Sequence, residues 1–360
     1  MAQRTVIPFG PQHPVLPEPI HLDLVLEDEL VVEALPSIGF VHRGLERLAE
    51  KHEFEEMIFV AERICGICSA IHGQGYAQAV EKLLGLEIPP RAAWLRTFWG
   101  ELSRIHSHLL WLGLAADAFG FESLFQHTWR IREMILDIIE ETTGGRVIFG
   151  SCKVGGVRRD ITKERFKEIT VELKKIEVQC REVAETFRYD HTVRQRTSGV
   201  GMLSPEDALA LGAVGPVMRA SGIAEDARSL GYAAFGDIDW SPVTDDRCDC
   251  LARTVVRIKE VYQSFDILYQ VADKIPDGEI DVGRIRGKPE GTFMARLEQP
   301  RGEVCYYVEG NGSKKLERFR VRTPTFANVP PLVHMLKGCD LADVPVIVLT
   351  IDPCISCTER

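Results

Sequence analysis

The stretch Glu62-Arg63-Ile64-Cys65-Gly66-Ile67-Cys68-Ser69-Ala70-Ile71-His72 contains two cysteines separated by two residues. The same spacing recurs at the other end of the chain, in Asp352-Pro353-Cys354-Ile355-Ser356-Cys357. Two thiolates at this spacing can bind one ion, because the chain turns back within a single loop. They select soft or borderline metals such as zinc, nickel, copper(I) or iron. Together the two pairs predict a site with four thiolate ligands.

A structural zinc site is the commonest meaning of two such pairs. Zinc-binding pairs are usually separated by about 15–20 residues, whereas these pairs lie at opposite ends of a 360-residue chain. A metal that joins both ends of a large core is more plausible in a catalytic site than in a structural one. The flanking residues Arg63, His72 and Asp352 favour the same interpretation, because a structural zinc site seldom needs polar neighbours.

The remaining cysteines do not form a second ligand set. Cys248 and Cys250 are separated by one residue, which suits two bonds to one metal poorly. We expect the others to be ordinary buried thiols: Cys152, Cys180, Cys305 and Cys339. A cytosolic chain keeps its thiols reduced, so no disulfide framework is expected. The chain therefore has no further cysteine set able to hold an iron–sulfur cluster.

Composition excludes several classes of protein. The chain has 43 basic and 53 acidic residues and a net charge of -10, which argues against a general nucleic-acid binder. The longest apolar run, Ser107–Ala116, is far shorter than the roughly 18 residues that a membrane helix needs. The N-terminus, Met1–Arg4, is not followed by the apolar core of a secretory signal. We therefore expect a cytoplasmic protein.

Hydrophobic periodicity predicts a mainly α (α+β) fold in one domain, 1–360. Long helices are predicted over Arg91–Ala118, Trp129–Thr142, Thr162–Arg188 and Asp245–Ile275. Alternating apolar residues predict two β-hairpins, His21–Leu26 with Leu30–Leu35 and Glu303–Val308 with Leu316–Val321. The five prolines of Ile7–Pro19 predict an extended segment. The expected layout is an extended and hairpin region (1–60), a central helical bundle (61–280), and a hairpin followed by the metal-ligand segment (281–360).

The chain resembles a known family from end to end. The stretch Glu62–His72 resembles the first signature of nickel–iron hydrogenase large subunits, and Asp352–Arg360 resembles the second. Ile7–Pro14 and Val41–Glu46 resemble the membrane-bound, energy-converting branch (group 4, Ech-type) and, equally, the related quinone-site subunit of respiratory complex I. That subunit lacks the four cysteines and binds no nickel, so their presence here favours a hydrogenase. The resemblance implies the [NiFe]-hydrogenase large-subunit fold and reversible interconversion of H2 with protons and electrons.

The resemblance also implies a role for each cysteine. Cys65 and Cys354 are expected to be terminal nickel ligands. Cys68 and Cys357 are expected to bridge nickel to an iron that carries carbon monoxide and two cyanide ligands. A terminal thiolate, here Cys354, can accept the first proton when H2 is cleaved. The alternatives that the residues leave open are a zinc-stabilised scaffold without catalysis and a quinone-binding subunit that kept its cysteines.

A carboxylate must carry the proton onward, and two candidates stand in the N-terminal region. Glu18, in Pro17-Glu18-Pro19, aligns best with the family's N-terminal glutamate beside nickel. Glu46 is the competitor, since Arg43-Gly44-Leu45-Glu46 is shared with the complex I branch. We favour Glu18 as the relay, and a proton-path or structural role for Glu46.

Four further residues are expected at the cofactor. His72 is expected to donate a hydrogen bond to a bridging sulfur. Pro300 and Arg301 resemble the segment that lies over the iron, where the guanidinium offers a fixed fork of donors to a cyanide ligand. Asp117 ends an apolar helix, where an unpaired carboxylate is costly, and is expected in the pocket.

The resemblance implies partners as well. Electrons are expected to leave through a small subunit with a proximal [4Fe–4S] cluster, in a complex with ferredoxin-like and membrane ion-translocating subunits. Ferredoxin is the expected electron partner, and the chain is expected to lie on the inner face of the cell membrane through these subunits. Large subunits of this family lose a C-terminal tail to a maturation protease once nickel-insertion proteins have acted, and an end at Arg360 is that expected after such cleavage.

Overall fold

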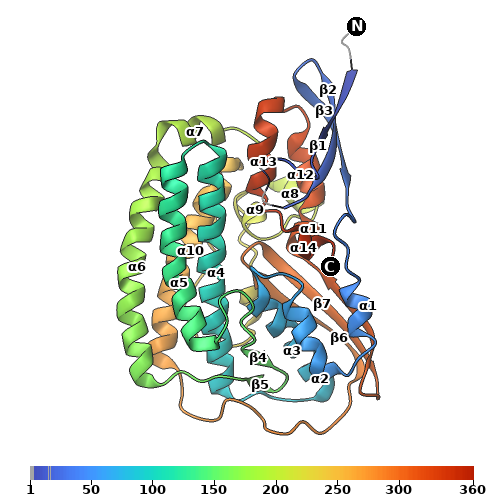
Figure 1. Ribbon diagram of the computed structural model, residues 1–360, viewed down its shortest axis with the longest axis vertical. Coiled ribbons are helices and arrows are strands. Elements are labelled where there is room, and N and C mark those ends of the chain that lie inside the picture. Colours follow the sequence, from blue (N-terminus) through green and yellow to red (C-terminus); the bar gives the residue numbers. More distant parts are fainter. Residues whose placement is uncertain (1–3, 15, 17) are drawn as a thin grey trace.

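The computed structural model describes residues 4–14, 16 and 18–360. It is mostly helical, with small antiparallel sheets near the two ends of the chain (Figure 1). The predicted fold class is therefore confirmed. Among the described residues, no helix is long and apolar enough to cross a membrane.

Four long helices lie side by side and form the central bundle (Figure 1). They are α4 (Pro90–Ala118), α5 (Glu122–Thr143), α6 (Lys163–Tyr189) and α10 (Cys250–Lys274). Each helix contacts the next, and α10 closes the ring on α4. All four helices were predicted, because each carries the apolar stripe that the bundle core requires.

The starts of these helices follow from their capping residues. Thr162 caps α6 as predicted, and its hydroxyl accepts a hydrogen bond from the backbone N–H of Arg165 at 3.2 Å. The predicted start of α10 at Asp245 is wrong. Asp249 is the cap, since its carboxylate accepts from the N–H of Ala252 at 2.7 Å, while Asp245 binds Arg247 in the preceding loop at 2.8 Å.

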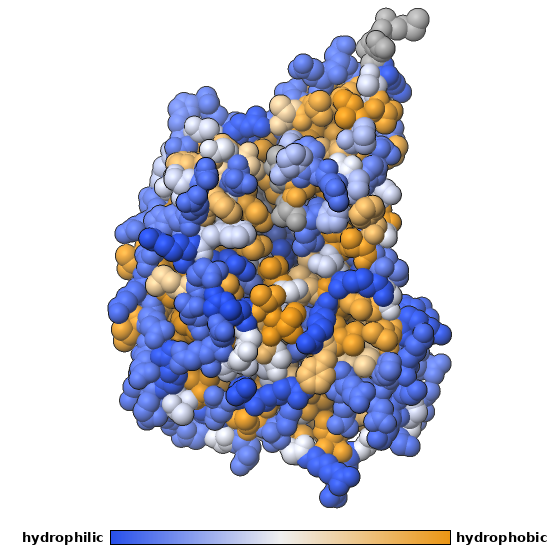
Figure 2. Space-filling view, in the orientation of Figure 1, coloured by the Kyte–Doolittle hydropathy of each residue, from blue (hydrophilic) through white to orange (hydrophobic). Residues whose placement is uncertain are grey.

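The N-terminal sheet has the order β1 (Arg4–Phe9), β2 (His21–Glu27) and β3 (Leu30–Ser37). The hairpin of β2 and β3 was predicted, whereas β1 was not. Residues 15 and 17 of the predicted extended segment lie outside the described residues. Several apolar side chains of this region are exposed, and Figure 2 shows apolar surface beside the N-terminal end: Val6, Ile7, Leu30, Leu35, Ile38 and Phe40.

The C-terminal sheet has the order β6 (Glu290–Gln299), β7 (Gly302–Asn311) and β8 (Leu316–Arg322). The pairing of β7 with β8 was predicted, and β6 was not. Gln299 pairs with Gly302 in the ladder, so Pro300 and Arg301 form the two-residue turn between β6 and β7. This turn holds Arg301 at the end of a rigid hairpin.

Short elements connect the bundle to the sheets. They are α1 (Leu45–Ala49), α2 (Phe54–Glu62), α3 (Ser69–Leu84), β4 (Cys152–Lys153), β5 (Gly156–Val157), α7 (His191–Thr197), α8 (Pro205–Ala210), α9 (Pro216–Arg219), η1 (Ala227–Leu230), α11 (Pro324–Ala327), α12 (Val329–Leu336), η2 (Leu341–Asp343), α13 (Val344–Thr350) and α14 (Ile355–Thr358). Helix α14 lies where the two main apolar clusters meet, because Ile355 belongs to one cluster and Cys354 and Cys357 to the other.

Candidate metal centre

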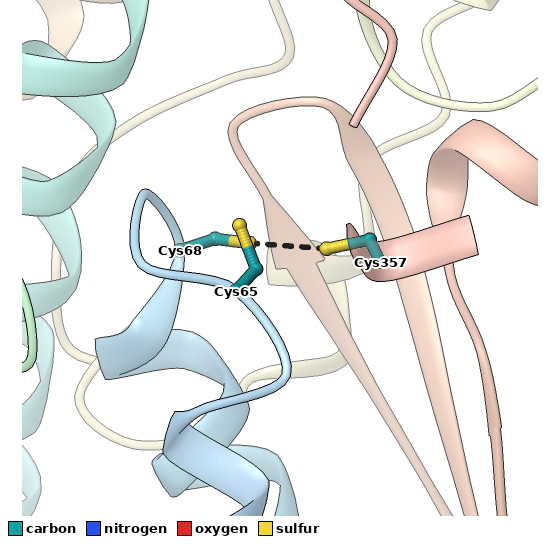
Figure 3. Close-up of side chains that lie close together, drawn as sticks. All are labelled: Cys65, Cys68 and Cys357. Atoms are coloured by element: carbon teal, nitrogen blue, oxygen red, sulfur yellow. Dashed lines mark hydrogen bonds between the residues drawn. The ribbon is translucent and has the colours of Figure 1, made fainter. Parts of the chain in front are cut away.

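Two segments from opposite ends of the chain bring the four predicted thiols together. Cys65 and Cys68 lie in the loop between α2 and α3, and Cys354 and Cys357 lie at the start and inside of α14. The Sγ atoms of Cys65 and Cys354 are 3.3 Å apart, and those of Cys68 and Cys357 are 3.5 Å apart. Figure 3 shows Cys65 and Cys68 facing Cys357 across the gap between the loop and α14. All four cysteines are buried.

This donor set suits a soft metal centre. The ligand atoms of Cys65, Cys68 and Cys357 all lie within 4.8 Å of one another. Burial opposes ionisation of these thiols, yet hydrogen bonds from Cys357 and Cys65 lower the pKa of Cys68 to about 6. Burial and hydrogen bonds with the neighbouring cysteines raise the pKa of Cys357 in turn, so a metal that binds these thiols as thiolates displaces the protons they share.

The side chains of two threonines hold the backbone of the C-terminal ligand loop in place. The N–H of Cys354 donates to Thr325 Oγ1 at 3.1 Å, and Thr323 Oγ1 donates to the carbonyl of Cys357 at 3.1 Å. Asp352 has a positive φ of 55°, an uncommon conformation that turns the chain into the loop.

Arg43 joins the two ligand loops directly. Its guanidinium donates to the carbonyl oxygens of Ile64 at 2.7 Å and Ser356 at 2.8 Å, one on each loop. It also donates to the carbonyl of Arg63 at 3.0 Å. No role for Arg43 was predicted from the sequence. The one indication of a role was that Arg43 lies in the stretch Val41–Glu46, which resembles the family. Its partners are backbone carbonyl oxygens, which every residue has, so no side-chain motif identifies them in the sequence.

Glu18 lies beside the second cysteine pair. Its carboxylate accepts hydrogen bonds from the N–H groups of Ile355 and Ser356, the latter at 3.2 Å. Burial and the neighbouring Cys354 raise the pKa of Glu18 to about 7, against the opposing effect of Arg301. A carboxyl group with such a pKa can both accept and release a proton near neutral pH.

Glu46 occupies a different position. Its carboxylate accepts from Arg360 Nε and from the N–H of Val321, both at 2.8 Å. These contacts tie the C-terminal residue to β8, which is a structural arrangement.

His72 lies against a sulfur of the cluster. Its Nε2 is 3.3 Å from Cys357 Sγ and 3.1 Å from Gln299 Nε2, while its Nδ1 contacts the hydroxyl of Tyr306. Burial lowers the pKa of His72 to about 3, so the ring is neutral at physiological pH. A Tyr306 hydroxyl that donates to Nδ1 leaves the ring proton on Nε2, where it faces the sulfur. This tautomer requires the Gln299 amide to turn its oxygen, which is buried without a partner among the described residues, toward Nε2. Gln299 and Tyr306 were not predicted, because only the register of β6 and β7 brings them to His72.

Arg301 reaches the site from the turn between β6 and β7. Its Nε donates to the carbonyl of Asp352 at 2.9 Å, and its NH2 pairs with the carboxylate of Asp352 at 3.0 Å. Its other terminal nitrogen, Nη1, is buried and has no hydrogen-bond partner among the described residues. Against the effect of burial, Asp352 and then the thiols of Cys354, Cys65 and Cys68 raise the pKa of Arg301, so its charge complements the cluster. Pro300 is buried in the same turn.

The structure does not bring Asp117 to the thiols. Helix α4 ends at Ala118, as predicted, but the Asp117 side chain is exposed rather than set in a pocket. The expectation rested on the apolar residues before Asp117, but these face the bundle core while Asp117 faces away from it. Arg63 is also exposed and donates to the carbonyl of Phe59 at 2.9 Å.

Comparison with known proteins identifies the family. The family model described as "Respiratory-chain NADH dehydrogenase, 49 Kd subunit" matches residues 118–287 and 282–360 of this chain. The family model described as "Nickel-dependent hydrogenase" matches residues 43–115. The chain belongs to the family of complex I 49 kDa subunits and [NiFe] hydrogenase large subunits.

Members of this family are similar to the chain over nearly its whole length. The membrane-bound hydrogenase subunit alpha of Pyrococcus furiosus is 36% identical over 98% of this chain and 87% of its own. The carbon monoxide-induced hydrogenase of Rhodospirillum rubrum is 37% identical over 98% of this chain and 99% of its own. A chain in the structure of the membrane-bound sulfane sulfur reductase, an archaeal respiratory membrane complex, superposes with a TM-score of 0.94 and 30% identity, covering 99% of this chain and 98% of that one. The family and fold that the sequence predicted are therefore confirmed.

Proposed function

We propose that this oxidoreductase large subunit is the catalytic subunit of a [NiFe] hydrogenase, which interconverts H2 with protons and electrons. The observation that carries the proposal is the buried cluster of Cys65, Cys68, Cys354 and Cys357, the ligand set expected of such a centre. Cys65 and Cys354 are the proposed terminal nickel ligands. Cys68 and Cys357 are the proposed bridges to an iron with carbon monoxide and two cyanide ligands. When bound, this metal pair supplies heterolytic cleavage of H2.

The polar residues around the cluster fit this cofactor. The Nη1 of Arg301 is a buried donor without an acceptor among the described residues, and a cyanide on iron would supply one. Pro300 holds Arg301 in its two-residue turn. The contact of 3.3 Å from His72 to Cys357 allows the neutral imidazole to donate to a proposed bridging sulfur and to lower its basicity.

The proposed proton path starts at Cys354 and passes to Glu18. Burial and the charge of Cys354 raise the pKa of Glu18, and the Glu18 carboxylate accepts from the N–H of Ile355, the residue next to Cys354. Glu18 also faces the surface pocket lined by His13, Leu16 and Phe40, which gives its proton a way out to solvent.

We assign electron transfer and attachment to the membrane to other subunits of the proposed complex. Electrons would leave through a small subunit with a proximal [4Fe–4S] cluster and pass to ferredoxin by way of ferredoxin-like subunits. Membrane ion-translocating subunits would hold the chain at the membrane, as in the group 4, Ech-type hydrogenases. The exposed apolar residues of the N-terminal sheet are a surface that such a partner can cover.

Metal analysis combined with infrared spectroscopy of the purified complex tests the proposal. We expect nickel and iron, with carbon monoxide and cyanide stretching bands in a spectral window that is otherwise empty for proteins. Zinc without these bands would identify a structural site. An intact complex with neither metal nor bands would identify a quinone-binding or sulfur-reducing relative, and both results contradict a hydrogenase.

Replacement of one ligand tests the site itself. Cys65→Ser should remove nickel and abolish H2/D2 exchange, because an alcohol is a much harder and less acidic ligand than a thiol. Cys180→Ser is the matched control, since Cys180 is a buried thiol of α6 outside the cluster. Nickel content that is equal in both variants would remove Cys65 from the ligand set.

A further inference from the structure

A second cluster of buried charged side chains lies next to the metal centre. It joins α4, α9, η1, α10 and β6, and every member is almost fully buried. The members are Glu101, Arg104, Arg219, Asp226, Arg228, Glu260 and Glu298. We refer to these residues as the buried charge network.

Short contacts connect the whole network. Arg219 pairs with Glu298 at 2.8 Å, with Glu260 at 2.7 Å and with Asp226 at 3.3 Å. Arg228 binds both oxygens of Asp226, at 3.0 and 2.7 Å.

Three further pairs complete the buried charge network. Arg228 contacts Glu101 at 3.4 Å, and Arg104 contacts Glu101 at 3.3 Å and Glu260 at 3.9 Å. The members therefore share one electrostatic environment rather than forming separate ion pairs.

The charges of this network do not balance. It contains four carboxylates and three guanidinium groups. His108 contacts Glu260 at 2.9 Å, but burial lowers its pKa, so it adds no charge. Arg257 donates to the carbonyls of Arg253 and Thr350 and forms no ion pair with the network, although burial lowers its pKa against the effects of Asp352 and Glu260. An excess buried charge is costly, and one proton on a carboxylate removes it.

Glu298 is the carboxyl group best placed to hold this proton, because it pairs with one guanidinium group whereas each of the other three carboxyl groups pairs with two. Burial and the neighbouring Asp226 raise the pKa of Glu298 to about 7, although Arg219 opposes the change. Against the effect of burial, Arg228 and Arg219 lower the pKa of Asp226 to about 2. Arg219 and His108 likewise hold the pKa of Glu260 well below its usual range.

Glu298 has access both to solvent and to the metal centre. It lines a pocket of about 310 Å³, together with Glu225, Asp226, Arg296 and Glu303. The next residue, Gln299, contacts His72, which contacts Cys357. Arg104 donates to the carbonyls of Glu298 at 3.0 Å and Gln299 at 3.2 Å, so the network supports the strand end that carries Gln299 and Arg301.

We infer that Glu298 exchanges one proton with solvent through this pocket and thereby sets the charge of the buried network beneath the metal centre. The proton passes between the Glu298 carboxyl and water, and no bond to carbon, sulfur or metal changes. Glu298 is a positioning residue, since it acts through Gln299 and Arg301. Only its effect on the metal centre depends on the proposed function.

Infrared difference spectra between about pH 6 and pH 8 test the proton exchange in purified complex that carries Glu18→Gln and Glu62→Gln. These two changes remove the other carboxyl groups with a pKa near 7, and the further variants are made in this background. We expect the C=O absorption of one protonated carboxyl group to disappear as the pH rises. Glu298→Gln should lack this signal, whereas Glu225→Gln should retain it, because Glu225 is an exposed carboxylate on the same pocket. A signal that persists in Glu298→Gln would overturn the inference. This measurement needs no metal, so its failure is distinct from failure of the proposed function.

A second variant tests the charge count even if Glu298→Gln does not fold. Glu260→Gln removes one negative charge and frees Arg219 to bind Glu298 more closely. The titration midpoint of the carboxyl signal should then fall by about one pH unit or more, and an unchanged midpoint would overturn the role of the network.

The link to the metal centre has its own readout. In the same Glu18→Gln/Glu62→Gln background, the cyanide stretching bands should shift across the same pH range, and after the further change Glu298→Gln they should not. A shift that persists in Glu298→Gln would overturn the coupling to the centre.

Discussion

Glu18 lies beside the thiols with a pKa near neutrality, and its replacement tests the proton relay. Glu18→Gln keeps the hydrogen bonds' geometry but cannot exchange a proton, so we expect both metals to be retained. H2/D2 exchange should fall by about 100-fold or more, the usual contribution of a positioned acid–base group. Glu46→Gln should retain exchange, because Glu46 binds Arg360 and Val321. Normal exchange in the Glu18 variant would refute the relay.

Glu62 is a buried carboxyl group that makes stability depend on pH. It is 1% exposed, neither oxygen has a hydrogen-bond partner among the described residues, and burial raises its pKa from 4.5 to about 7. The folded state therefore binds more protons than the unfolded state between these values, and stability falls as the pH rises through them. The shift corresponds to about 3 kcal/mol.

Glu62→Gln should remove this part of the pH dependence. We expect the unfolding free energy of the variant to fall less between about pH 5 and pH 8 than that of the wild type, as measured by denaturant titration. Glu55→Gln is the control, since Glu55 is exposed on the same helix. Equal pH dependence in the wild type and Glu62→Gln would show that Glu62 is ionised in the fold.

At the scale of elements, the start of α10 shows how a cap is selected. Several acidic residues precede this helix, and each can cap it on sequence grounds. Asp249 is selected because its second oxygen also accepts from the N–H of Gly199 at 2.9 Å. That contact is with a distant loop and cannot be read from the local sequence.

Asp249→Ala should therefore loosen the first turn of α10. Loss of a capping bond costs about 1–2 kcal/mol, so amide hydrogen exchange at Ala252 should become about 5–30-fold faster. Asp246→Ala, at an exposed position in the same loop, should change it little. Similar exchange rates in the two variants would contradict the capping role.

At the scale of the whole molecule, Arg43 holds together ligand loops that are distant in sequence. One terminal nitrogen of Arg43 donates to the carbonyls of Ile64 and Ser356 and the other to that of Arg63, and the single ammonium group of a lysine cannot occupy both positions. Arg43→Lys should therefore lower the nickel content of the purified complex, although all four ligands are present. Arg47→Lys is the control, because Arg47 is exposed and pairs only with Glu50 among the described residues. Full nickel content in Arg43→Lys would show that the loops need no clamp.

The sequence alone was sufficient for features set by local periodicity or spacing. Amphipathic stripes predicted the four bundle helices, and alternation predicted two of the hairpins. Strands β1 and β6 were missed, because each pairs with a predicted strand without carrying a clear alternation of its own. Asp117 was misplaced, because the sequence does not say which way a residue at a helix end faces.

The two cysteine pairs were visible in the sequence, because the spacing within a pair is a property of one loop. Only the tertiary structure decided what surrounds them. It placed Glu18 at the thiols and Glu46 at Arg360, brought Gln299 and Tyr306 to His72, and let Arg43 bridge both loops. It also assembled the buried charge network from five elements. Burial and proximity between distant segments determine a proton affinity, and neither exists until the chain has folded.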